Sequence, residues 1–140
     1  MVIKRKVNKA DLVRDFLQQK GCPSHIIRGG LSGLVENWKN VVKSVGQGYP
    51  LGLDDYLNDL DGRQLLEEAL AIASIEQKEK YRERVKRADE LMKTYVKPAG
   101  KCLWGKEAAK AEGWTAEKNW WYFSQPIHAD PELLSEIEKV

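Results

Sequence analysis

Two cysteines and two histidines are the residues of this chain best suited to metal binding or nucleophilic catalysis. Cys22 and His25 stand in a Cys-x-x-His spacing, but Cys102 and His128 would have to complete a zinc site without the local pairing that such sites usually show. Cys22 and His25 also lack any sequence sign of the orienting group and oxyanion hole that a nucleophile and its base need. We therefore expect no metal site, no cofactor and no enzymatic activity.

A dense group of acids near the middle of the chain invites comparison with a calcium-binding loop. If Gly62 takes the sixth position of an EF-hand loop, Asp59 and Asp61 take the third and fifth, and Glu68 takes the twelfth. The first position then falls on Leu57, which cannot supply the carboxylate that the geometry requires. We expect these acids instead to favour the first turn of a helix, to be solvated, or to receive a basic surface of this chain or of a partner.

Residues 21–28 have the turn chemistry of a helix-turn-helix motif, in which a glycine releases the first helix and a serine caps the second. In this interpretation Ser24, His25 and Arg28 would contact DNA bases and phosphates. The nine basic and three acidic residues among the first fifty favour it, whereas two glycines directly after Arg28 would interrupt the recognition helix. A nucleic-acid-binding regulator that uses the segment at 10–28 is therefore the alternative function.

Half of the twelve aromatic residues fall within twenty positions of the C-terminal part of the chain: Trp104, Trp114, Trp120, Trp121, Tyr122 and Phe123. Each large ring buries about 150–250 Å² when packed, so these rings alone can anchor a tail that is poor in long helices. Three consecutive residues, 120–122, cannot all face inward, and Trp and Tyr are favoured in protein interfaces. The alternative to plain core is therefore a partner-binding surface, predicted at Trp104, Trp120, Trp121 and Tyr122.

Helical periodicity runs through nearly the whole chain, and no stretch alternates as a strand does. Asn8 is the predicted cap of a first helix, which carries its apolar face over 12–17. The next helix, 34–45, has a clear amphipathic pattern, and the glycines at 29–33 weaken any helix that would continue into it. Shorter helices are expected from Asp54 to Leu60, over 106–112, after Thr115 and after Asp130.

The chain has neither glycine nor proline between Gly62, which is predicted to end the preceding helix, and Pro98. This predicts one long helix over about 63–96, which either projects or bends near its polar stretch at 76–80. Its second half carries a seam with the spacing of helix packing, made of Tyr81, Val85, Ala88, Met92 and Tyr95. We predict that a second copy, in a dimer, or the C-terminal segment covers this seam.

Length and composition fit one domain over 1–140, since 42% of the 140 residues are hydrophobic and 31% are charged. The predicted fold class is all-α, a single compact helical domain with the long helix at about 63–96 and an aromatic-rich C-terminal segment of short helices. The net charge is only +2, because basic and acidic stretches alternate along the chain. Total charge therefore points to neither nucleic acid nor a membrane.

The N-terminus lacks the apolar region of a signal peptide, and the longest apolar run is too short to span a bilayer. We expect a cytoplasmic protein with reduced thiols and no membrane partner. The function predicted from these features is that of a small non-catalytic protein-interaction domain. Its predicted partner is another protein or a second copy of itself, as a homodimer.

Overall fold

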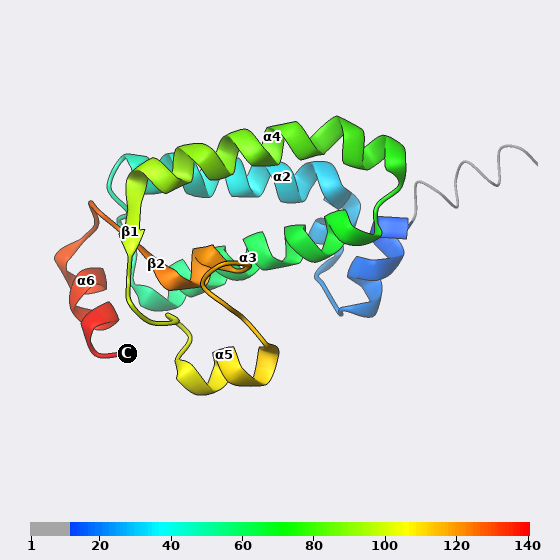
Figure 1. The fold of residues 1–140 in the computed structure, drawn as a ribbon. Helices are drawn as coiled ribbons and strands as arrows, with labels where there is room; N and C mark the ends of the chain where they lie inside the picture. The colour runs from blue at the N-terminus through cyan, green and yellow to red at the C-terminus, as the bar shows by residue number, and fades with distance from the viewer. Residues whose placement is uncertain (1–11) are drawn as a thin grey trace, which may run out of the picture.

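A computed structural model of the chain describes residues 12–140 (Figure 1). The helices are a first one over residues 12–19, then α2 (Ser24–Gly46), α3 (Leu53–Ile72), α4 (Ile75–Tyr95), α5 (Lys106–Glu112) and α6 (Pro131–Glu138). The other elements are the 3-10 turn η1 (Trp120–Phe123) and the strands β1 (Val96–Pro98) and β2 (Ser124–Pro126). The predicted all-α class is confirmed, and the predicted cap at Asn8 lies outside the described residues.

Three helices, α2, α3 and α4, form the body of the molecule (Figure 1). α2 and α4 lie side by side and run in the same direction. Two contacts show this: Trp38 donates a hydrogen bond to Asp89 near the middle of both helices, and Gly46 packs against the ring of Tyr95 at their C-terminal ends. Short connections at each end of α3 reverse the chain, so α3 runs opposite to both. α2 therefore has one helix neighbour on each side.

α2 consists of two helical pieces joined at Gly30. Gly30 has φ 58° and ψ −153°, a conformation that is open almost only to glycine. It is also buried, and the side chain of Arg14 lies 3.6 Å from the place where a Cβ would stand. The predicted weakness at 29–33 is thus confirmed as a break, and the piece after it is the helix predicted over 34–45.

The long helix predicted over 63–96 is instead two helices, α3 and α4. The break falls at Ser74, whose hydroxyl oxygen accepts from the backbone N–H of Gln77 at 3.2 Å, while the Gln77 side chain accepts from the backbone N–H of Ser74 at 3.3 Å. This reciprocal capping box starts α4. The Ser-x-x-Gln pattern is a sequence signature of such a start, and it explains the bend without any glycine or proline.

α3 also begins earlier than expected, because Gly62 does not end the helix but lies inside it. A glycine inside a helix costs only about 1 kcal/mol relative to alanine. Leu60 and Leu66, on either side of it, are fully buried, and each contributes about 1.5–3 kcal/mol of burial. Packing of the flanking leucines therefore outweighs the local propensity.

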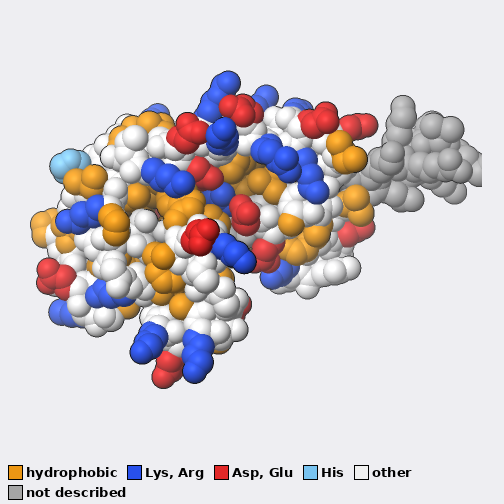
Figure 2. All heavy atoms as spheres, in the orientation of Figure 1, with side chains coloured by type: hydrophobic (Ala, Val, Ile, Leu, Met, Phe, Trp, Pro, Cys, Tyr) orange, Lys and Arg blue, Asp and Glu red, His pale blue; other side chains and the backbone are white. Residues whose placement is uncertain are grey.

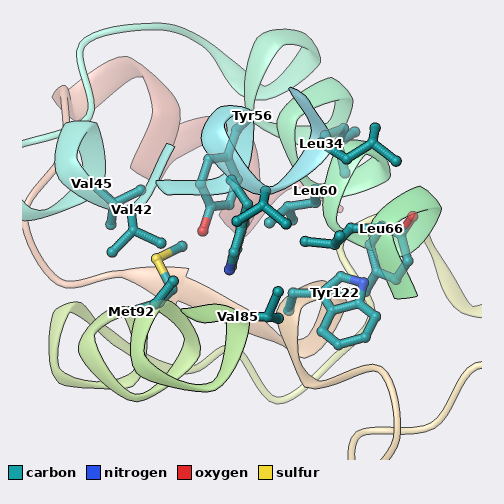
Figure 3. Close-up of a cluster of buried hydrophobic side chains, with 14 of the residues drawn as sticks. Leu34, Val42, Val45, Tyr56, Leu60, Leu66, Val85, Met92 and Tyr122 are labelled. Carbon is teal, nitrogen blue, oxygen red and sulfur yellow. The ribbon is translucent and has the colours of Figure 1, made fainter. Parts of the chain in front are cut away.

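The core lies between the three long helices and η1 (Figure 3). Figure 3 shows Met92 of α4 pointing toward the α2 valines, and the side chains of α3 and η1 completing the cluster. The labelled members are Leu34, Val42 and Val45 of α2, Tyr56, Leu60 and Leu66 of α3, Val85 and Met92 of α4, and Tyr122 of η1. All of them expose 5% or less of their surface, so one continuous core joins the N-terminal and C-terminal halves.

The seam predicted for self-association is an internal packing face. Tyr81, Val85, Ala88 and Met92 are buried, and Tyr95 is half-buried against Gly46. The element that packs along them is α2 of the same chain, which is neither a second copy nor the C-terminal segment. This corrects the predicted role of the seam, because most of its surface is already covered within one chain.

A two-stranded antiparallel sheet, which the sequence analysis did not predict, ties the C-terminal segment to the end of α4. β1 pairs with β2 in a register that places Val96 opposite Pro126. The pairing closes a loop of chain from β1 back to β2, and this loop carries α5 and η1. The loop thereby brings η1 back to the three-helix body, where it packs against α3.

Candidate interaction surfaces

The four aromatic residues predicted to bind a partner are divided between core and surface. Trp121 and Tyr122 expose only 2% and 1% of their surface and belong to the core, which corrects the prediction for these two. Trp104 exposes 44%, and Trp120 is half-buried beneath the ammonium group of Lys93, 4.9 Å from the ring centre. Only Trp104 and Trp120 therefore keep ring surface that a partner can contact.

Arg63 of α3 is a charged residue with only 4% of its surface exposed. Its guanidinium donates to both carboxylate oxygens of Asp89 on α4, at 3.0 and 2.8 Å, and to Glu67 at 3.0 Å. The ring of Trp121 lies 4.2 Å from the guanidinium carbon, and Trp38 of α2 donates its indole N–H to Asp89 at 2.8 Å. Burial disfavours the charge on Arg63, but the hydrogen bonds and negative charges of Asp89 and Glu67 together outweigh it and raise the pKa of the guanidinium. The cluster is a structural tie between four elements.

The acids of the first half of α3 accept hydrogen bonds from phenol and indole groups of the same chain. The Tyr122 hydroxyl donates to Oδ1 of Asp61 at 2.7 Å, and the indole N–H of Trp104 donates to the same oxygen at 2.9 Å. The Tyr49 hydroxyl donates to Asp59 at 2.6 Å. Burial raises the pKa of Asp59 and, together with these hydrogen bonds, the pKa of both tyrosines. Asp61 thus holds the aromatic C-terminal segment and Asp59 holds Tyr49, so neither acid receives the basic surface that was one expectation.

The residues considered for metal binding are dispersed. Because Gly62 is inside α3, the acidic segment has no EF-hand loop. Cys22 is half-buried and Cys102 is buried, both as free thiols, while His25 and His128 are exposed. Over residues 12–140, no three His, Cys, Asp or Glu side chains come together as a metal site requires.

The residues considered for DNA contact lie on the short first piece of α2. Ser24, His25 and Arg28 are all exposed there. Pro23, not Ser24, occupies the cap position, and no side chain caps the helix. The break at Gly30 ends this piece after fewer than two turns. A recognition helix of this length presents few side chains to a DNA groove.

A groove between α2 and α4 is the feature that the sequence analysis missed. Its volume is about 700 Å³. We call it the α2–α4 groove, and it is lined by Lys39, Val42, Lys43, Gly46, Gln47, Arg84, Arg87, Ala88, Leu91 and Tyr95. Four of these residues are basic and none is acidic, while the floor is apolar. The groove thus combines a cationic rim with a hydrophobic base.

Two other hollows of similar size differ from this groove in the charges that line them. The hollow between α2 and α3, of about 570 Å³, contains the carboxylates of Asp59 and Asp61, which accept the hydrogen bonds from Tyr49, Tyr122 and Trp104. The hollow between α3 and α4, of about 510 Å³, contains basic and acidic residues side by side. Figure 2 shows this mixture of Lys, Arg, Asp and Glu over the front of α4. Of these three hollows, the α2–α4 groove is therefore the one whose charged lining residues are all basic.

Comparison of the chain with protein-family models, with curated proteins and with solved structures gave no match. Over residues 12–140, no helix has both the length and the apolar character needed to cross a membrane. Any proposal about function therefore has to come from the surfaces described above.

Proposed function

We propose that this chain is a cytoplasmic, non-catalytic protein-interaction domain that holds a segment of a partner protein in the α2–α4 groove. The observation that carries the proposal is the groove itself, with four cations around an apolar floor. Protein-recognition grooves commonly bury an apolar stripe of the partner and use surrounding charges to select it.

The charges around the groove are available to a partner. Neither Lys43 nor Arg84 forms an ion pair within the described residues, and Lys39 and Arg87 form only exposed pairs with a neighbour on their own helix. Such exposed pairs contribute about 0–1 kcal/mol, so a better-placed carboxylate displaces them at little cost. The apolar surface is available too, since Leu91 exposes 47% of its side chain at the edge of the groove.

Peptide-library selection tests the proposal without knowledge of the natural partner. The folded chain is used as bait, and selected peptides are retested on Lys43→Glu/Arg84→Glu, which reverses two charges in the groove. The matched control is Lys110→Glu/Lys118→Glu, which makes the same charge change at two exposed positions elsewhere. We expect selected peptides to bind the control and lose affinity for the groove variant. Peptides that bind all three proteins equally would place the docking site elsewhere and contradict the proposal.

A further inference from the structure

We infer that the segment held in the α2–α4 groove is an acidic amphipathic α-helix of another protein, an inference that rests on the proposed function. The first argument is charge. Basic side chains stand on both walls, Lys39 and Lys43 on α2 and Arg84 and Arg87 on α4, and no acid lines the groove. A ligand in the groove therefore meets cations on both of its flanks and gains most when both flanks carry carboxylates.

The second argument is the chemistry of the floor. Val42 and Ala88 lie at the base of the groove, both almost fully buried by the surrounding chain, and Leu91 stands half-exposed beside them. Aliphatic side chains suit the leucine or isoleucine stripe of an amphipathic helix. Nucleic-acid bases instead need aromatic platforms, and the single aromatic residue here, Tyr95, is packed against Gly46.

The third argument is shape. The lining residues extend over 39–47 of α2 and 84–95 of α4, which at 1.5 Å per residue is about 12–17 Å. That length accommodates about two to three helical turns, which is enough for apolar residues at i, i+3 or i+4, and i+7, a span of about two turns. Because α2 and α4 are parallel neighbours, a third helix lying between them contacts both along its whole length. A flat membrane surface would touch the rim without reaching Val42 at the base.

The chain itself does not offer a suitable occupant. Among the described residues, large exposed apolar side chains are scattered singly over several elements and form no stripe on an acidic helix: Leu12, Leu51, Ile72, Ile75, Leu91, Trp104, Ile127 and Val140. The segment 1–11 has four basic residues and one acidic residue, so its charge has the same sign as the rim. The described residues and the segment 1–11 therefore leave the groove open to a segment of another protein.

Synthetic peptides test the inference directly. The probe is a helical peptide of about 16 residues with leucines at i, i+3, i+7 and i+10 and glutamates flanking them. Two matched peptides replace every glutamate by glutamine or by lysine. We expect the glutamate peptide to bind at least about tenfold more tightly than the glutamine peptide, and the lysine peptide to bind least. Raising the salt from about 0.05 to 0.5 M should weaken only the glutamate peptide strongly.

Protein variants then locate the binding. Lys43→Glu/Arg84→Glu should lose about tenfold or more of the affinity for the glutamate peptide, and Lys110→Glu/Lys118→Glu should keep it. Leu91→Ala removes an exposed apolar contact with little effect on folding, so it should weaken all three peptides alike. Circular dichroism and thermal melting of every variant confirm that the fold is intact before binding is compared.

The outcomes separate the inference from the proposed function. If the glutamine peptide binds the groove as tightly as the glutamate peptide, the partner is a neutral segment, and the inference is wrong while the proposed function stands. If no peptide responds to the groove variant, both are wrong. If single-stranded DNA or vesicles with anionic lipid bind more tightly than the glutamate peptide, and the groove variant releases them, the groove serves nucleic acid or membrane and the inference is overturned.

Discussion

Trp120 and Trp121 are adjacent in sequence, yet their replacement by alanine should have clearly different effects on stability. Trp121 exposes 2% of its surface and stacks on the guanidinium of Arg63, so Trp121→Ala should cost about 3–5 kcal/mol. The indole N–H of Trp121 is buried without a hydrogen-bond partner, which places the expected loss toward the lower end. Trp120 keeps part of its ring exposed, so Trp120→Ala removes less contact and should cost less, about 2–3 kcal/mol.

The expected difference between the two variants is thus about 1 kcal/mol, with Trp121→Ala the more destabilising. Urea denaturation followed by far-UV circular dichroism measures it, since tryptophan fluorescence changes with the substitutions themselves. The slope of the unfolding free energy against urea concentration should be the same for both variants, because the same amount of surface becomes exposed on unfolding. Equal losses for the two variants would refute the reasoning, because they would mean that the partly exposed ring of Trp120 contributes as much to the core as the buried ring of Trp121.

Three further perturbations test separate parts of the structure. Asp89→Ala leaves the buried Arg63 without its main partner and should lower the free energy of unfolding by about 3–5 kcal/mol in the same assay. A loss below about 1 kcal/mol would contradict the structural role of this ion pair. Gly46→Ala places a methyl group 2.6 Å from the Tyr95 ring and should lower the melting temperature, whereas Gly33→Ala, with open space around it, should not. Burial raises the pKa of Asp59 above 3.8, so the folded state binds the proton more tightly than the unfolded state does. The free energy of unfolding of the wild type should therefore fall, relative to that of Asp59→Asn, as the pH rises from 3.8. A difference between the two proteins that does not change with pH would refute this.

The sequence was sufficient for the helical class and for the helix over 34–45, because its apolar residues recur at the helical period and that signal is local. The boundary at Ser74 was not predicted, although its Ser-x-x-Gln cap is also a local signal, because a stretch without glycine or proline favours one continuous helix. The course of α3 through Gly62 could not be predicted from local propensity. It depends on burial against α2 and η1, which only the folded chain supplies.

The partner-binding residues were harder to predict because exposure depends on contacts between distant segments. The seam of α4 was recognised correctly as a packing face, but α2, about 50 positions earlier, occupies it. The α2–α4 groove likewise depends on contacts between distant segments of the chain. Lys39 and Lys43 flank a buried valine, and Arg84 and Arg87 precede a buried alanine. Each pair alone looks like a solvated helix face, and only the parallel packing of the two helices brings them together.

The buried charge at Arg63 and the groove are linked through the rotation of α4 about its axis. Asp89 points inward to Arg63, while Ala88 and Leu91 line the groove on another side of the same helix. Rotating α4 by one residue position, about 100°, would break the two-oxygen contact with the guanidinium and take Leu91 out of the groove. A hydrophobic pair of similar volume often stabilises a protein as well as a buried ion pair does, but it is less directional. The charged pair therefore acts together with the buried side chains of Val85 and Met92 to favour the observed rotation of α4.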